Sequence, residues 1–297
     1  MNNDNIDKVE LSILMPLYEG EEYLKETLQC ILSQSFNNFE LIILDNQSTD
    51  NSAKIVESFL LKDKRINYIY DDKMRNGNDC FNELIKHCNG EYVIVVNDDN
   101  YLHKDFFLNL LNNIKLKNSD LTICNGWYID GDKNKKKIFF KKKSYFNNQP
   151  SLFKVLNFFI RGDVIPLLLP AICLTKTFSK LLPYKNLSKF ENDADTLMGI
   201  KILSNLKVNF LNNELFYCRI YDDHKRFHNS KIPTNKILYL IEKIRHNLNL
   251  IKEIFYEIKK SKLNMISKLM VFLILPLLLL IKRIKITMLI ILKYFKS

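Results

Sequence analysis

Residues 9–114 alternate between short apolar segments and longer segments with helical periodicity, and few folds accommodate this order. Asp50 is predicted to cap the N-terminus of one of these helices, and Gly90 is predicted to stop another at its C-terminus. The predicted strands are Leu11–Met15 (ended by Pro16), Phe39–Leu44, Ile66–Tyr70 and Glu91–Val96. The predicted helices are Glu21–Gln34, about Asn51 to Leu61, Asn78–Cys88 and Leu102–Ile114. This order predicts an α/β fold: a doubly wound, mostly parallel sheet with helices on both faces.

The pattern is less regular beyond residue 115. Asp130–Lys143 is rich in charge and predicts a solvated hairpin tip. Ser151–Pro183 is apolar with several prolines, and Phe190–Ser204 predicts a helix that opens with acidic residues.

The net positive charge of the chain lies in its C-terminal part. Residues 231–297 contain 14 lysine and arginine residues against three acidic ones, which accounts for the whole formal net charge of +11. Two apolar runs, Leu269–Ile281 and Ile286–Leu292, are separated by three cations that a single membrane span would bury. The pattern predicts helices in a membrane interface, and a helix in a soluble core is the alternative. A basic, apolar tail favours an anionic membrane surface over nucleic acid as its partner.

The six cysteines are scattered without a Cys-x-x-Cys pair, and the first ten residues are polar and acidic rather than typical of a signal peptide. We therefore expect reduced thiols, mostly as small core residues, and a cytosolic compartment. Together with the tail, this predicts a peripheral or monotopic protein on the cytoplasmic face of the cell membrane.

Two adjacent carboxylates, Asp98 and Asp99, follow the apolar strand Glu91–Val96. Ligands of open parallel sheets bind outside the carboxyl ends of the strands. Adjacent carboxylates in such a place repel each other and lose solvent, so they persist if a cation binds there. Their oxygens suit Mg²⁺ or Mn²⁺, with water and phosphate completing the shell. A turn followed by a helix cap is the alternative interpretation.

Asp45 directly ends the strand Phe39–Leu44, before a turn in which Ser48 and Asp50 are predicted to cap the next helix. A carboxylate in this position is suited to accept a hydrogen bond from the N–H of a uracil or guanine base.

Two runs of the chain resemble the family 2 glycosyltransferases, which have the GT-A fold. The runs are LSILMPLYEGEEYLKETLQCILSQSFNNFELIILDNQSTDNS and NGNDCFNELIKHCNGEYVIVVNDDNYL. The resemblance is strong over residues 9–110 and weaker over 170–226. It implies a catalytic domain over 1–230, in which 9–110 bind a nucleotide sugar and 111–230 form the acceptor side, followed by the membrane-associating tail 231–297.

The resemblance also implies roles for single residues. Asp45 matches the base-binding carboxylate, and Asn46 stands where the family often has a second Asp. Asn97-Asp98-Asp99 matches the Asp-x-Asp metal motif, and Asp98-Asp99-Asn100 is an alternative register. Asp99 belongs to both and is the first metal ligand predicted, with Asp98 the second. The predicted nucleotide-sugar-binding residues are Pro16, Leu17, Tyr18, Glu19, Asp45, Asn46, Arg75, Asn97 and Asp98.

A third acidic group, Glu191 to Asp195, resembles the family segment that carries the general base. Asp193 is the first candidate for this base. Glu191 and Asp195, which share a helix face by their i, i+4 spacing, are the alternatives. The alternative to a catalytic role is that these acidic residues only begin a helix, where the macrodipole favours negative charge. Arg219, His224 and Arg226 match the segment after the family's last strand, as contacts to a diphosphate or as solvated loop residues.

The implied function is metal-assisted transfer, with inversion, of a sugar from a UDP- or GDP-sugar to a hydroxyl of a glycan or lipid-linked acceptor, in cell-surface polysaccharide or glycolipid synthesis. The chain has no Gly-x-Gly, which argues against dinucleotide-binding dehydrogenases and sugar nucleotidyltransferases. At Asn46, Asn97 and Asn192 this chain has asparagine where the family has an acidic residue. The alternative function is therefore that of a membrane-bound pseudoenzyme, which binds nucleotide sugars without turnover.

Overall fold

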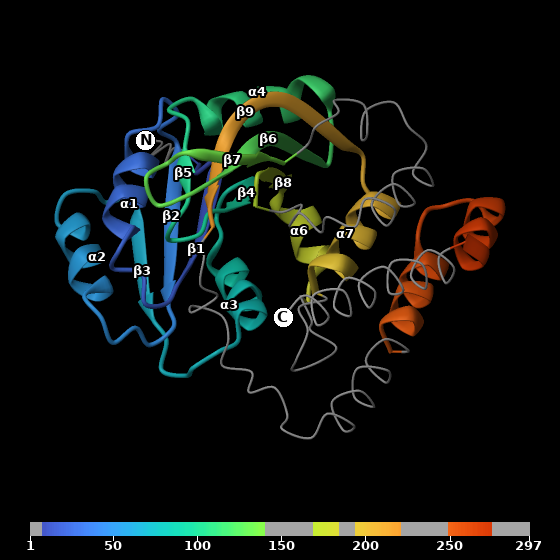
Figure 1. The fold of residues 1–297 in the computed structure, drawn as a ribbon, viewed down its shortest axis with the longest axis horizontal. Helices are drawn as coiled ribbons and strands as arrows, with labels where there is room; N and C mark the ends of the chain where they lie inside the picture. Colours follow the sequence, from blue (N-terminus) through green and yellow to red (C-terminus); the bar gives the residue numbers. More distant parts are fainter. Residues whose placement is uncertain (1–7, 140–168, 184–193, 221–248, 275–297) are drawn as a thin grey trace, which may run out of the picture. The chain divides into compact units, whose positions relative to one another are not determined.

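The computed structural model describes residues 8–139, 169–183, 194–220 and 249–274. They belong to two compact units. The first contains 8–139, 169–183 and 207–220, and the second contains 194–206 and 249–274. All the strands of the described residues lie in the first unit (Figure 1).

The first unit is built on a sheet of nine strands in the described part of the chain, in the order β3-β2-β1-β4-β8-β6-β9-β5, with β7 paired to β6. The pairs among β3, β2, β1 and β4 are parallel, and so is β6 with β9; β8, β5 and β7 pair antiparallel to their neighbours. The strands are β1 (Leu11–Leu17), β2 (Phe39–Asp45), β3 (Ile66–Tyr70), β4 (Tyr92–Val95), β5 (Tyr101–Leu102), β6 (Leu121–Ile129), β7 (Lys135–Ile138), β8 (Ala171–Leu174) and β9 (Val208–Arg219).

The helices of this unit connect the strands as the alternating sequence predicts. They are α1 (Leu24–Leu32), α2 (Ser52–Leu60), α3 (Gly77–Leu84, continued by the 3₁₀ turn Ile85–His87), α4 (Phe106–Lys117) and α6 (Thr175–Leu181). Figure 1 shows α1 and α2 on one side of the first strands and α3 on the other. Right-handed crossovers require this, because the chain moves outward from β1 to β3 and then returns to place β4 on the other side of β1.

The strand order therefore reverses between β1 and β4, and ligands of doubly wound sheets bind at such a point. The inner strands β1 and β2 are buried there except for one residue in each. Leu11, Ile13, Leu14 and Met15 of β1 have no exposed surface, and Leu41, Ile42 and Ile43 of β2 have none either. This apolar core fixes the strand register, and with it the positions of the polar residues that follow each strand.

Three local predictions were wrong. The first strand does not end before Pro16. Pro16 lies within β1 and pairs with Leu44 of β2. On its other side β1 pairs with β4 only as far as Leu14, so the missing N–H of the proline breaks no ladder bond there. The predicted helix does not start at Leu102, because Tyr101 and Leu102 pair with β9 and α4 begins only at Phe106.

The third concerns Gly90, which does not stop α3, since that helix ends at Leu84. It permits a close approach to β1 instead. A methyl group on Gly90 would lie 2.5 Å from the backbone nitrogen of Ser12. The N–H of Gly90 donates to Ser12 Oγ at 2.8 Å, and its carbonyl accepts from Thr175 Oγ1 at 2.7 Å.

The predicted hairpin at 130–143 is confirmed as far as residue 139, because β6 and β7 pair antiparallel around a turn at residues 130–134. All six cysteines lie within the described residues, and all six are free thiols.

The second unit is helical in its described residues. It contains α7 (Ala194–Asn205) and the helical residues 249–260 and 265–274. No helix in the described parts of the chain is both long enough and apolar enough to span a bilayer. Most of the predicted interfacial runs, from residue 275 on, lie outside the described residues.

Candidate active site

The loops that follow β1, β2 and β4 lie together where the strand order reverses. Leu17, at the end of β1, pairs with Asp45 at the end of β2. The N–H of Asn46 donates to the carbonyl of Leu17 at 2.9 Å, and the N–H of Val96, just after β4, donates to the carbonyl of Leu14 at 3.0 Å. Polar residues from three loops thus share one edge of the sheet.

Asp98 and Asp99 occupy the turn between β4 and β5, and each is only 9% exposed. A methyl group on Gly20, in the loop after β1, would lie 2.5 Å from Asp98 Oδ2, so the glycine leaves room for this carboxylate. Asn100 fixes the turn. Its Oδ1 accepts from the N–H of Asn97 at 2.9 Å, and its Nδ2 donates to Asp99 Oδ1 at 3.1 Å. In the alternative register, Asp98-Asp99-Asn100, the side chain of Asn100 is therefore already hydrogen-bonded within the turn.

Arg219, the last residue of β9, holds the same turn. It is 4% exposed, and its Nη1 donates to the backbone oxygen of Asp99 at 2.5 Å. Its Nη2 donates to Glu26 in α1, and its guanidinium carbon lies 4.1 Å from the ring centre of Tyr23. The buried Nε has no hydrogen-bond partner in the described part of the chain. The arginine thus binds the backbone of the turn that carries the two carboxylates, while His224 and Arg226 lie outside the described residues.

Glu26 pairs with a second cation, Lys133, in the turn between β6 and β7. Burial raises the pKa of Glu26, but Lys133 and Arg219 together lower it further, so the pKa lies below its ordinary value. The ammonium of Lys133 also lies 4.5 Å from the ring centre of Tyr101. The hairpin is therefore tied to the Asp99 turn through Glu26. Sequence reasoning missed Glu26, because its partners are far away in the chain.

Asp45 is fully buried, and both of its oxygens accept hydrogen bonds within the protein. Oδ1 accepts from the N–H of Ser48 at 2.8 Å, and Oδ2 accepts from the hydroxyl of Tyr68, in β3, at 2.7 Å. Burial and the hydrogen bond to Asp45 raise the pKa of Tyr68. The tyrosine thus stays protonated and orients the carboxylate. Nothing in the sequence singled out Tyr68, which is one of three tyrosines in residues 66–92.

The loops after β1 and β2 cap each other. Glu19, which has a positive φ of 50°, accepts from the N–H of Thr49 at 2.8 Å, and its own N–H donates to Ser48 Oγ at 3.1 Å. Asp50 accepts from the N–H of Ser52 at 2.9 Å and from that of Glu21 at 3.0 Å. Neither Ser48 nor Asp50 is the N-cap of α2, which is Asn51. Asp50 nevertheless binds the first N–H of the helix and also joins it to the loop after β1. Tyr18 is left 41% exposed at the edge.

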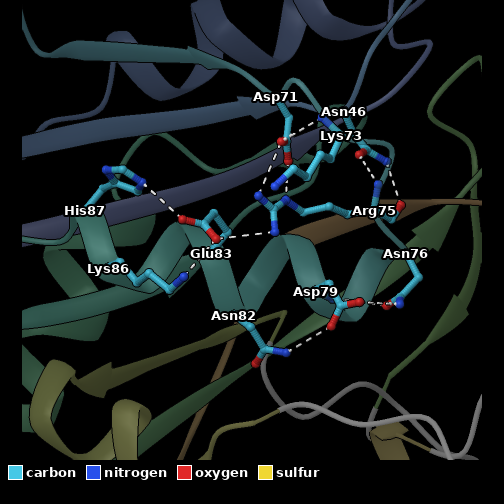
Figure 2. A network of polar contacts seen from close by, with 10 residues as sticks. All are labelled: Asn46, Asp71, Lys73, Arg75, Asn76, Asp79, Asn82, Glu83, Lys86 and His87. Atoms are coloured by element: carbon cyan, nitrogen blue, oxygen red, sulfur yellow. Dashed lines mark hydrogen bonds and ion pairs between the residues drawn. The ribbon is translucent and has the colours of Figure 1, made fainter.

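Arg75 lies at the centre of a polar network that leads into α3 (Figure 2). Its guanidinium pairs with Asp71 and, at 3.4 Å, with Glu83 of α3. The hydrogen bond from Arg75 lowers the pKa of Asp71, and Asp71 raises the pKa of Arg75. The hydrogen bond from Lys86 lowers the pKa of Glu83. The predicted sugar-nucleotide residue Arg75 is thus held by two carboxylates of the protein itself.

The start of α3 is fixed in the same network. Asn76 caps the helix, because its Oδ1 accepts from the N–H of Asn78 at 3.1 Å and from that of Asp79 at 3.0 Å. Asn46, at the end of β2, binds the backbone of Arg75 through both ends of its amide group. The position of Arg75 is therefore determined by β2 and by α3 together.

Two of the candidates for the general base, Glu191 and Asp193, lie outside the described residues. Asp195 is half-buried in the first turn of α7. In the parts of the chain that the structure describes, no group of three or more His, Cys, Asp or Glu side chains is arranged to hold a metal ion. The pair Asp98 and Asp99 could therefore supply only part of a coordination shell.

Comparison with known proteins places these features in one family. The model of "Glycosyl transferase family 2" matches residues 12–167, more than half of the chain. Glycosyltransferase GlyG of Streptococcus pneumoniae is 29% identical over 120 residues, which are 40% of this chain and 40% of that protein. The amylovoran biosynthesis glycosyltransferase AmsB of Erwinia amylovora is 32% identical over 99 residues, a third of each chain. The chain thus spans less than half the length of either relative.

Solved structures with the same fold include TarS residues 1–349 of S. aureus in complex with UDP-GlcNAc. The TM-score is 0.66 at 19% identity, covering 89% of this chain and 70% of that one. The mannosyltransferase PcManGT of Pyrobaculum calidifontis, in complex with GDP-Man and Mn²⁺, gives a TM-score of 0.52 at 13% identity, covering 87% and 66%.

Proposed function

Because the chain belongs to glycosyl transferase family 2, we propose that it transfers a sugar from a nucleotide-sugar donor to a hydroxyl group of a glycan or lipid-linked acceptor. One observation carries the proposal. Two adjacent, nearly buried carboxylates, Asp98 and Asp99, lie at the reversal of strand order, beside the loops that end β1 and β2. This is the place in a doubly wound sheet where a nucleotide binds.

The donor would lie across the ends of β1, β2 and β4. Asp45 is held in one orientation by Ser48 and Tyr68. Because it is fully buried in this structure, a base N–H would reach its carboxylate only after the loops over it move. The structures with a similar fold contain UDP-GlcNAc and GDP-Man, and both uracil and guanine carry an N–H that can donate a hydrogen bond. We therefore propose a UDP- or GDP-sugar as the donor.

The oxygen ligands at this site fit a divalent metal ion that binds together with the nucleotide sugar. Asp98 and Asp99 offer hard oxygen ligands, and the space kept by Gly20 admits the Asp98 carboxylate. Two protein carboxylates with phosphate and water are the usual shell of Mg²⁺, and PcManGT was solved with Mn²⁺. When bound, such an ion supplies positive charge to the leaving diphosphate. Arg219 holds the turn that carries both carboxylates, through its hydrogen bond to the backbone oxygen of Asp99.

The transfer would proceed by a single displacement with inversion. The acceptor oxygen attacks the anomeric carbon as the bond to the diphosphate breaks, and a carboxylate takes the acceptor proton. Asp193 is the first candidate for this general base, with Glu191 and Asp195 as alternatives. The family relationship supports the role, and substitution of each residue in turn tests which one performs it.

The test measures release of nucleoside diphosphate from a panel of UDP- and GDP-sugars, with Mn²⁺ and with EDTA. We expect one donor to be used only with the metal, and Asp99→Asn to abolish release while the protein remains folded. Asp72→Asn, at an exposed position, is the matched control and should keep full activity. Metal-dependent nucleotide binding without release from any donor would show the pseudoenzyme instead. Absence of both binding and release would refute the site.

A further inference from the structure

Helical residues 265–274 carry a continuous apolar stripe on their surface. Met265 is 84% exposed and Leu273 is 69% exposed, and the three residues between them on the same face are also exposed. At 100° per residue the stripe covers an arc of about 140°. The five residues are Met265, Ile266, Leu269, Met270 and Leu273. Scattered exposed apolar residues need no explanation, but a contiguous face of this kind marks an interaction surface.

The stripe is not the face with which this helix joins its own unit. Val271, on the opposite side, is fully buried, and Phe272 packs edge-to-face on Phe255 with ring centres 4.9 Å apart. Ile254 and Ile258 of the preceding helix are also fully buried. The helix therefore has one apolar face inside the unit and a second one outside it.

The sequence that adjoins the stripe is basic. Residues 258–274 contain four lysines and no aspartate or glutamate. Lys259, Lys260 and Lys262 are exposed. The ammonium of Lys260 lies 4.1 Å from the ring centre of Tyr256, which is itself half-exposed. An exposed apolar helix face whose adjoining sequence carries exposed lysines and a half-exposed tyrosine has the composition of a segment that lies in a membrane interface.

Hydrogen bonds fix the turn between the two helical segments. Lys268 Nζ donates to the carbonyl of Lys259 at 2.8 Å, where the first helix ends. Asn264 Oδ1 accepts from the N–H of Ser267 at 2.8 Å and caps the second helix. The Ser261 hydroxyl donates to the carbonyl of Ile258 at 2.6 Å. These hydrogen bonds fix the turn that joins the lysine-bearing segment to the helix with the apolar stripe.

We propose that this surface, the stripe with Lys259, Lys260 and Lys262, binds an anionic lipid bilayer in the interfacial plane. Electrostatic complementarity selects this occupant, since the lysines attract lipid phosphates, whereas a second copy of the chain would bring like charges together. An interfacial helix buries its apolar face at the level of the headgroups and needs no spanning length. The proposal does not depend on the sugar-transfer activity.

The test is co-sedimentation of the full chain with two kinds of vesicle, phosphatidylcholine alone and phosphatidylcholine with phosphatidylglycerol. We expect binding mainly to the anionic vesicles. The variant Ile266→Gln/Leu269→Gln/Leu273→Gln should lower the partition coefficient at least about tenfold. Leu61→Gln/Leu116→Gln is the matched control, because both leucines are strongly exposed but belong to the first unit. It should bind as the wild type does.

A second variant separates charge from apolar burial. Lys259→Gln/Lys260→Gln/Lys262→Gln should lose the preference for anionic vesicles and the salt dependence of binding, with an unchanged unfolding transition. Equal binding by the stripe variant and the wild type would overturn the proposal. So would a stripe variant that binds vesicles normally but loses a concentration-dependent dimer in light scattering, because the occupant would then be a second copy.

Discussion

Asn46 closes two hydrogen bonds on the backbone of Arg75. Its Oδ1 accepts from the Arg75 N–H at 2.7 Å, and its Nδ2 donates to the Arg75 carbonyl at 2.8 Å. Only an amide side chain can accept and donate in this way, because an ionised carboxylate has no donor. The asparagine at this position, where the family often has an aspartate, therefore has a structural reason in this chain. It fixes the residue that pairs with Asp71 and Glu83.

Asn46→Asp should destabilise the protein. The carboxylate would face the Arg75 carbonyl, and a nearly buried acceptor would lose its donor, which costs about 1–3 kcal/mol. Urea unfolding at neutral pH measures the loss. Asn112→Asp, on the exposed side of α4, makes the same chemical change and should stay within about 0.5 kcal/mol of the wild type. Equal stability of the two variants would contradict the structural role of Asn46.

Asp71→Asn should remove part of the pH dependence of stability. The hydrogen bond from Arg75 lowers the pKa of Asp71, so its stabilisation is complete above the unfolded-state pKa of about 3.9 and is lost as the pH falls through the lower folded-state value. The variant should lose about 1–3 kcal/mol at neutral pH, and its stability should fall less steeply than that of the wild type below about pH 4. Asp72→Asn, at the exposed neighbouring position, removes the same charge and should keep the wild-type slope.

Gly20→Ala should impair metal-dependent binding of a nucleoside diphosphate. The new methyl group would lie 2.5 Å from Asp98 Oδ2 and 2.7 Å from Leu17 Cδ1, so the carboxylate has to move. A displacement of this size should weaken binding about tenfold or more. Isothermal titration with UDP and GDP in the presence of Mn²⁺ measures it. Gly77→Ala, where a methyl group meets nothing within 4 Å, is the control. Unchanged affinity in Gly20→Ala would remove Asp98 from the metal site.

Arg219 and Glu26 should be energetically coupled. Removing Glu26 leaves the buried Arg219 without its ion pair, and removing Arg219 leaves Glu26 with Lys133 alone. The double variant Arg219→Gln/Glu26→Gln should therefore cost less than the two single changes added together. The coupling should lie between about 0.5 and 3 kcal/mol, and nearer the lower limit, because Glu26 is about one-third exposed. Denaturant unfolding of all four proteins gives the cycle. A coupling of zero would mean that Arg219 holds the Asp99 turn without help from α1.

The sequence by itself determined the alternation of strands and helices, since both periodicities are local. It also determined which polar residues follow the strands, and hence that Asp45, Asp98 and Asp99 share one edge of the sheet. The family resemblance from the same residues was confirmed by the family match over 12–167. The metal, the general base and the membrane tail stay predictions.

Only the tertiary structure decided how these residues are held. Pro16 is tolerated within β1 because β4 has already diverged there, and Tyr101 and Leu102 form a strand because β9 lies beside them. Tyr68 meets Asp45, and Arg219 meets Asp99, across 23 and 120 positions of the chain. Such contacts have no local signal, because they depend on which strands become neighbours, and that is set by burial of the whole core.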